Sequence, residues 1–268
     1  MNLELFYVTL FFYLLGTGTH CAFIITQRKG TGMWANLFMA FGLAAHTVAI
    51  ALRYMEVGHT PVANLHESLS FFAWCLVGIY LAVQLRYRVP ILGAFISPIA
   101  LAMVIGASIL PKETLHFDEV LRSFWFPIHV CTAFMGDAVF GLAAAAGVMY
   151  IIQENQLKSK KVGAWFHRLP SLDVLDQVNH RCIAIGFSLF TAGMITGMAW
   201  YQSAYGKYWD WEPRLTWSLV TWLLYAAILH MRLLAGWRGR RAAILSIAGF
   251  AIIIASFLGL EHFILEAG

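Results

Sequence analysis

Charged residues are scarce in this sequence. Of its 268 residues only 12% are Asp, Glu, Lys or Arg, whereas 60% are hydrophobic. A soluble domain carries about 25% charged residues, so the composition excludes a soluble protein and indicates a polytopic membrane protein. The net charge of +4 gives no argument for nucleic acid binding, because the basic residues cluster at the ends of apolar segments.

Several chemical signatures are also missing. The four cysteines all lie in apolar stretches, and none belongs to a C-x-x-C or C-x-x-C-H motif. This excludes a thiol oxidoreductase of the usual sort and a c-type cytochrome. No Ser–His–Asp, P-loop or zinc signature occurs. The N-terminus, M-N-L-E-L-F, lacks the basic region of a cleaved signal peptide, so we expect it to begin the first span.

Apolar segments dominate what is present. Eight of them have the length of about 20 residues that crosses a bilayer as a helix. The expected spans are 3–26, 33–54, 67–87, 90–110, 126–153, 178–201, 214–235 and 241–262. The sequence therefore predicts an all-α polytopic membrane protein that forms one domain over residues 1–268.

The basic residues indicate the orientation of these spans. Thirteen of the 18 Lys and Arg flank one set of alternate loops, and five lie on the opposite side. The positive-inside rule then places both termini outside, together with the loop between the sixth and seventh spans. In a bacterial inner membrane that side faces the periplasm.

Aromatic residues concentrate in this outer loop. The stretch 200–222 holds five of the ten tryptophans, with Gly206 and Pro213 as helix breakers. One interpretation is an interfacial aromatic belt. The other is a platform for a large planar ligand with carboxylates, such as a haem, because flat apolar faces lie beside Lys207 and Arg214.

Three of the ten histidines are candidate iron ligands. His129 and His262 lie at the outer ends of their spans, level with the aromatic loop, and could supply two axial imidazoles. The alternative is that each is a solvated interfacial histidine. His230 lies near the inner end of its span, where His20 is an in-chain alternative to a ligand from a partner. For His20 and His46 a hydrogen bond between helices is the favoured interpretation.

Four separated motifs resemble those of the cytochrome c assembly, haem-handling superfamily. The loop Y-G-K-Y-W-D-W-E-P resembles its tryptophan-rich "WWD" motif. T-W-S-L-V-T-W-L-L-Y with His230 resembles the continuation of that motif, and G-H-T-P-V-A-N-L-H-E-S-L and the P-I-H-V at His129 resemble upstream elements. Tyr205, Glu212 and Arg214 replace Trp, Asp and Lys of the usual pattern. The similarity is greatest to the CcsA branch of system II.

The resemblance implies a function and a site. His129 and His262 would be the external haem ligands, and His230 an inner ligand at a transmembrane site. The implied cofactor-binding residues of the loop are Gly206, Tyr208, Trp209, Trp211, Glu212 and Arg214. The protein would bind b-type, non-covalent haem and present it for attachment to apocytochrome c. A CcsB/ResB-like membrane protein would be a separate partner chain, with which it would form a haem-lyase complex.

Two alternative functions remain open. HemX-like regulators of haem biosynthesis are near relatives, and a b-type haem electron-transfer subunit would also carry histidines in its spans. The acidic Asp137, near the middle of the fifth span, must be protonated, hydrated or paired in any of these.

Overall fold

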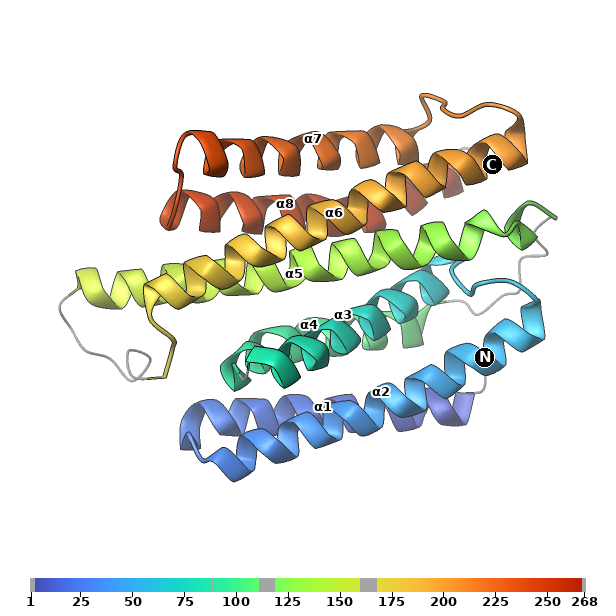
Figure 1. Cartoon of the computed structure of the whole chain (residues 1–268). Coiled ribbons are helices and arrows are strands. Elements are labelled where there is room, and N and C mark those ends of the chain that lie inside the picture. Colours follow the sequence, from blue (N-terminus) through green and yellow to red (C-terminus); the bar gives the residue numbers. More distant parts are fainter. Residues whose placement is uncertain (1–2, 88, 111–118, 160–167, 267–268) are drawn as a thin grey trace. The chain divides into compact units, whose positions relative to one another are not determined.

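The computed structural model of the chain describes residues 3–87, 89–110, 119–159 and 168–266, of which 258–266 are described by their backbone alone. Its α-helices are α1 (Leu3–Thr26), α2 (Lys29–Val57), α3 (Leu65–Tyr87), α4 (Gly93–Ile109), α5 (Trp125–Lys158), α6 (Leu172–Tyr205), α7 (Pro213–Leu234) and α8 (Arg240–Glu266). Two 3₁₀ turns, Pro90–Leu92 and Glu119–Arg122, precede α4 and α5. The described ranges contain no strand, and the predicted all-α class is confirmed (Figure 1).

Within the described ranges eight helices are long and apolar enough to cross a membrane, so the chain is a multi-pass membrane protein, as predicted. Several of them extend beyond the expected spans, among them α5 and α6. α5 continues to Lys158, where Lys158 pairs with Glu154 one turn earlier at 2.9 Å. α6 begins already at Leu172, where the hydroxyl of Ser171 caps the helix by accepting from the Val174 N–H. Polar helix formers lengthen both helices outside their apolar part.

The chain forms two compact units, Met1–Arg122 with α1 to α4 and Ser123–Gly268 with α5 to α8. Each is described by itself below. The expectation of a single membrane domain over the whole chain stays a prediction.

Buried polar side chains join the helices of the first unit, in which α1 packs on α2 and α4, and α3 packs on α2 and α4. His46 on α2 bonds with both ring nitrogens, to the Tyr13 hydroxyl at 3.3 Å and to the Ser70 hydroxyl at 2.8 Å. His20 on α1 bonds to the Tyr80 hydroxyl at 3.1 Å. The interpretation of His20 and His46 as partners in hydrogen bonds between helices is confirmed.

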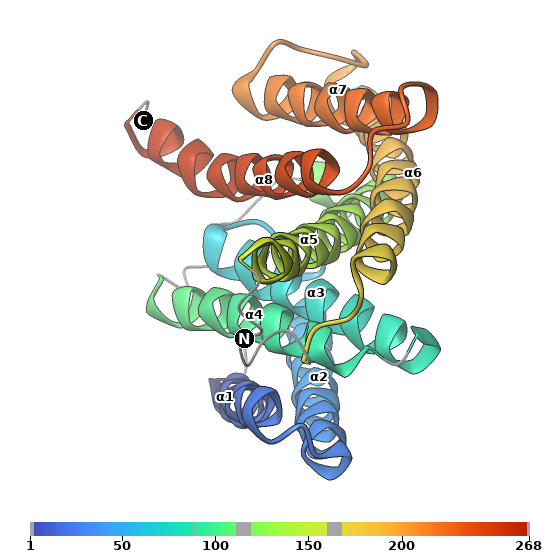
Figure 2. The ribbon, with the colours of Figure 1, turned by 90° about the vertical axis from the view of Figure 1, so that its left-hand side faces the viewer.

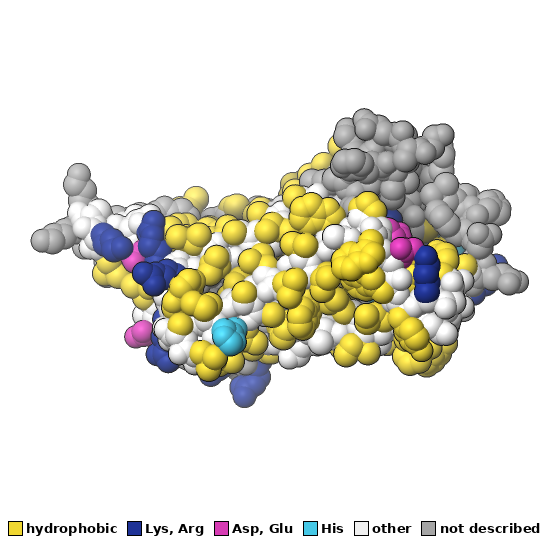
Figure 3. All heavy atoms as spheres, turned by 90° about the horizontal axis from the view of Figure 1, so that it is seen from above, with side chains coloured by type: hydrophobic (Ala, Val, Ile, Leu, Met, Phe, Trp, Pro, Cys, Tyr) yellow, Lys and Arg dark blue, Asp and Glu magenta, His cyan; other side chains and the backbone are white. Residues whose placement is uncertain are grey.

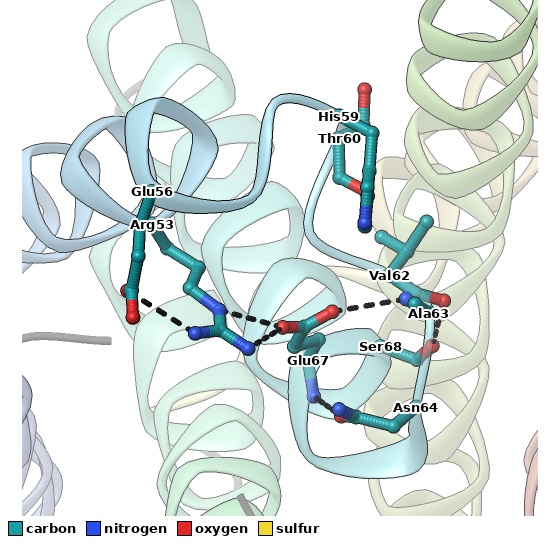
Figure 4. Close-up of polar contacts among 9 residues, drawn as sticks. All are labelled: Arg53, Glu56, His59, Thr60, Val62, Ala63, Asn64, Glu67 and Ser68. Carbon is teal, nitrogen blue, oxygen red and sulfur yellow. Dashed lines mark hydrogen bonds and ion pairs between the residues drawn. The ribbon is translucent and has the colours of Figure 1, made fainter. Parts of the chain in front are cut away.

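A buried ion pair holds the loop between α2 and α3 (Figure 4). Arg53 donates through Nε to Glu67 Oε1 at 2.8 Å, and the two side chains are only 5% and 2% exposed. The other oxygen of Glu67 accepts the Ala63 N–H at 3.0 Å, while the Asn64 side chain accepts the Glu67 N–H at 2.8 Å. Asn64 thus caps α3. The Glu67 side chain accepts the backbone N–H of the residue just before the cap, which is a variant of the capping box.

Small residues let α5 and α6 approach closely in the second unit. A Cβ at Gly136 would lie 2.9 Å from the backbone nitrogen of Phe190, and one at Gly193 would lie 3.0 Å from the Cα of Ala133. Such small residues are typical of packed membrane helices. α8 packs against α5 and α7, as the end-on view shows (Figure 2). The close α5–α6 contact fixes the side chains that face each other at its ends.

Candidate functional site

The loop between α6 and α7 spans residues 206–212 and has defined ends. α6 ends at Tyr205, and Gly206 follows with φ 72°, a left-handed conformation that glycine adopts without strain. The Gly206 N–H donates to the Gln202 carbonyl at 2.9 Å. α7 begins at Pro213 directly after an extended Glu212, in the first-turn position that proline favours. The irregular loop predicted from Gly206 and Pro213 is therefore present, bounded by a glycine C-cap on α6 and a proline at the start of α7.

Two side-chain contacts tie the loop down. The Tyr201 hydroxyl donates to Glu212 Oε1 at 2.7 Å, which links the end of the loop to the last turn of α6. Lys207 forms an ion pair with Asp210, whose other oxygen accepts the Trp211 N–H at 2.8 Å. The Lys207 ammonium and this N–H lower the pKa of the Asp210 carboxyl, so it is ionised at neutral pH. Lys207 is thus already neutralised within the loop.

The loop exposes its aromatic side chains. Trp211 is 74% exposed and Tyr208 64% exposed, while Trp209 is half-buried. The Trp209 and Trp211 rings meet edge to face, with centroids 5.9 Å apart and planes at 80°. A planar ligand can therefore lie flat on one of these rings and meet the other at its edge. Arg214 follows as an exposed cation that forms no ion pair with a described residue.

His129 is the best-positioned imidazole of the second unit. It lies in the second turn of α5, and its Nδ1 bonds to the Gly193 carbonyl of α6 at 2.8 Å. Because a carbonyl only accepts, Nδ1 carries the proton and Nε2 keeps its lone pair. The ring also stacks on Trp200, with centroids 5.9 Å apart and an angle of 9°. This is the arrangement that fixes the tautomer and orientation of a metal-binding histidine.

The other two predicted ligands differ from His129. The side chain of His262 lies outside the described residues, although its helix, α8, ends on the side of the second unit where the aromatic loop lies (Figure 1). His230 is an exposed side chain near the last turn of α7 and has no hydrogen bond to any residue that the structure describes. The structure therefore stacks His129 on Trp200 of α6, the helix that leads into the aromatic loop, and leaves His230 near the opposite end of α7.

Asp137 lies in the buried middle of α5, close to Tyr225 of α7. Its Oδ1 and the Tyr225 hydroxyl are both buried without a hydrogen bond to a described residue. Phe140, one turn after Asp137, stacks on the Tyr225 ring at 3.5 Å, so both groups lie on one side of α5. A carboxyl without a cation partner in a membrane interior keeps its proton, so of the alternatives stated for Asp137 the structure favours the protonated one.

Sequence reasoning missed two supports of this site. It did not single out Gly193, whose carbonyl accepts the hydrogen bond of His129. It also counted Trp200 with the loop aromatics, whereas this ring lies under the His129 imidazole. The order of the helices offered one signal. Because α5 and α6 are consecutive and antiparallel, the first residues of α5 lie beside the last residues of α6.

Comparison with known proteins identifies relatives of this chain. A family model described as "Cytochrome C assembly protein" matches residues 62–265. A cytochrome c biogenesis protein CcsA of Synechococcus sp. (strain CC9311) is 32% identical over 267 residues, which cover 88% of this chain and 87% of that protein. The CcsA of Synechococcus elongatus is 33% identical over 272 residues, covering 85% and 82%.

A solved structure shares the fold. "Cytochrome c Heme Lyase CcmF" matches with a TM-score of 0.63 at 17% identity, over 97% of this chain and 48% of that one. The chain thus spans about half the length of that protein, and the likeness concerns the fold alone. The family match extends over most of the chain, and the relatives exceed 30% identity across their length. The chain therefore belongs to the cytochrome c assembly protein family.

Proposed function

We propose that this protein binds haem non-covalently beside its aromatic loop and presents it for covalent attachment to apocytochrome c. The observation that carries the proposal is His129, with its ring held by Gly193 and Trp200 and its Nε2 without a hydrogen bond to any described residue. Relatives named for cytochrome c biogenesis support the same process.

The residues of the loop fit such a group. Haem needs an imidazole for its iron, flat apolar contacts for its ring, and cations for its carboxylates. His129 offers the first, Tyr208, Trp209 and Trp211 the second, and Arg214 the third. When bound, haem supplies the vinyl groups to which the apocytochrome thiols add; the chain contributes binding and orientation. Gly206 and Glu212 fix the ends of the loop that holds these groups.

His262 is our candidate for the second axial ligand at this outer site. It belongs to the end of α8, on the side of the second unit where the aromatic loop lies. Two imidazoles would leave the iron low-spin, and each would be replaceable by an exogenous imidazole after mutation to glycine.

His230 is our candidate ligand of a second haem site at the inner end of α7. A histidine exposed on a membrane span must find a partner, and no described residue of this chain provides one. The space-filling view shows mainly hydrophobic side chains on this face, between its charged ends (Figure 3). A CcsB/ResB-like chain would cover this position and supply the other ligand, and together they would form the haem-lyase complex.

The orientation that we propose follows from the charges. In the same view Lys and Arg gather mainly at the end where α7 turns into α8 (Figure 3). That end would face the cytoplasm of a bacterial inner membrane, with the aromatic loop and both termini in the periplasm. Reporter fusions at Lys160 and Gly206 should therefore indicate opposite sides, with Gly206 outside; a same-side result would contradict the topology.

The rival functions are less well supported. A HemX-like regulator shares the fold, but the relatives named above are biogenesis proteins. A b-type electron-transfer subunit needs paired histidines on facing helices at one depth, whereas His20 and His46 are engaged in hydrogen bonds.

The absorption spectrum tests the proposal. Purified wild-type protein should show a low-spin b-type spectrum. The His129→Gly and His262→Gly variants should lose haem and recover both spectrum and cytochrome c maturation with added imidazole. Replacing Trp209 and Trp211 by Ala should lower haem retention without rescue by imidazole, since the lost contact is apolar. Normal haem content and maturation in both glycine variants would refute the outer ligand pair.

A further inference from the structure

The turn between α7 and α8 borders an open, shallow hollow at the basic end of the second unit. The hollow has a volume of about 490 Å³ and is lined by Ala235, Gly236, Trp237, Arg238, Arg240 and Arg241. The chain reverses here through Gly236 and Gly239, whose φ angles are 63° and 66°. The volume lies within the range of small-ligand sites, about 300–1,000 Å³.

The arginines around this turn are not equally neutralised. Arg232 pairs with Asp176 at 2.6 Å, and Arg240 pairs with Glu154 at 2.7 Å. Arg238 and Arg241, in contrast, have no carboxylate within ion-pair distance among the residues described. Two of the three arginines that line the hollow thus carry uncompensated charge.

An aromatic ring lies beside one of these two cations. The guanidinium of Arg241 is 5.4 Å from the centre of the Trp237 ring, a cation–π distance. Arg238 also borders a neighbouring hollow of about 300 Å³ with Asp173 and Asp176 on its wall, so acids attract it from one side. Arginine presents paired N–H donors that match a carboxylate or phosphate. The lining therefore suits an amphipathic anion with more than one oxyanion group.

The hollow lies next to the exposed histidine of α7. His230 precedes the last residue of that helix, Leu234, by four positions, which is a rise of about 6 Å. His230 and the arginines of the turn therefore lie at the same end of α7.

We propose that Arg238 and Arg241 bind the two carboxylates of haem on the inner side, as the anion-binding part of the site that contains His230. The identity of the ligand rests on the function proposed above. The same guanidinium chemistry would take the phosphate of an anionic lipid headgroup. The Trp237 ring and the nearby imidazole favour the porphyrin, and the experiment separates the two sources.

The test measures haem binding to the full chain in lipid nanodiscs of phosphatidylcholine. A background with both His129→Gly and His262→Gly removes the outer ligands, so the remaining binding reports the inner site, and His230→Ala should abolish it. In that background Arg238→Gln with Arg241→Gln should weaken hemin binding about tenfold or more, because charge-assisted hydrogen bonds are lost. Binding of hemin dimethyl ester, which lacks the carboxylates, should not change. Replacing both arginines by Lys should weaken hemin binding less.

Exposed basic residues of the first unit supply the matched control. Arg28→Gln with Lys29→Gln removes as much charge from another turn and should leave hemin binding unchanged. Equal weakening for hemin and its ester would show a general disturbance of the site and overturn the proposal. An effect seen only after phosphatidylglycerol is added would assign the hollow to lipid. If the wild-type protein binds no hemin at all, the proposed function is wrong. If it binds hemin but replacing Arg238 and Arg241 by Gln does not weaken that binding, only the present inference is wrong.

Discussion

The histidines of the two units have opposite environments. In the first unit His46 uses both ring nitrogens and His20 shares one between Tyr80 and Asn36, while His66 bonds to the Ala107 carbonyl at 2.6 Å. In the second unit His129 uses one ring nitrogen for a hydrogen bond to a backbone carbonyl, and His230 has no hydrogen bond to a described residue. Depth in the membrane therefore does not identify a ligand. What separates the two groups is access: His20, His46 and His66 are buried, whereas His129 is half-buried and His230 is exposed.

Two ion pairs, one from each unit, also differ in their exposure to solvent. The Arg53–Glu67 pair of the first unit is nearly inaccessible and organises a loop, whereas Lys207 and Asp210 of the second unit are 53% and 42% exposed. A buried pair is costly to break, while an exposed one contributes little. We infer that the first unit is built for stability and that the loop of the second is built to contact a ligand.

Breaking the buried pair should give the largest effect. Glu67→Ala leaves Arg53 buried without its main partner and releases the Ala63 N–H, so we expect a loss of about 3–5 kcal/mol of stability. Thermal unfolding in detergent measures it. Glu56→Ala removes the exposed partner of Arg53 and should cost about 0–1 kcal/mol.

A double replacement sharpens this prediction. Arg53→Met with Glu67→Leu removes both charges together and should recover a large part of the loss. Bound haem in the surviving folded protein should keep its wild-type spectrum. A spectrum altered by Glu67→Ala would contradict the assignment of this pair to stability alone.

Replacing a buried histidine of the first unit and replacing the candidate ligand of the second unit should affect different properties, stability in one case and the haem spectrum in the other. His46→Ala loses two buried hydrogen bonds and leaves a cavity, at a cost of about 2–4 kcal/mol. It should not change the haem spectrum. His129→Ala should cost less stability, because only one hydrogen bond is lost, but should change the spectrum and cytochrome c maturation. If both variants affect the same property, the distinction between the units is wrong.

The spans could be predicted because a bilayer demands about 20 apolar residues, a property of composition alone. The helix ends could not: Glu154 and Lys158 continue α5 through a salt bridge outside the apolar run. The depth of His129 also follows from its position in its span. Its contacts with Gly193 and Trp200 depend on how α5 and α6 are rotated, and helices apolar on all sides do not specify that rotation.

The buried ion pair shows an available signal that was not used. Asn64 and Glu67 have the spacing of a capping box, which marks the start of α3. Arg53 lies fourteen positions earlier than Glu67, and its contribution depends on the fold of the intervening loop. Local motifs can therefore be recognised in the sequence, whereas contacts between residues on either side of a loop are known only from the structure.

Crowding the His129 ring should have a smaller effect than deleting it. A Cβ at Gly197 would lie 2.8 Å from two atoms of the imidazole, so Gly197→Ala should tilt the ring away from its hydrogen bond to Gly193. We expect haem affinity to fall about tenfold, or about 1.4 kcal/mol, as for the loss of a group that orients a ligand. Spectral titration measures it. Gly18→Ala, which meets no atom within 4 Å, is the matched control.

The exposed pair of the loop should give the smallest effect, and only above acidic pH. Lys207 and the Trp211 N–H lower the pKa of Asp210 in the folded protein. The contribution of Asp210 to loop order is therefore present above its unfolded pKa of about 3.9 and is lost as the pH falls through the lower folded value.

Asp210→Asn should increase the mobility of the loop at pH 7, measured by fluorescence anisotropy of Trp209 and Trp211 in a background where other tryptophans are replaced by Phe. Wild type and variant should converge as the pH falls below the folded pKa, and 1 M salt should reduce their difference at neutral pH because both partners are exposed. Asp173→Asn, at the other end of α6, should show no difference at any pH. A difference between wild type and Asp210→Asn that persisted unchanged in acid and in salt would mean that the loop is ordered by something other than this ion pair.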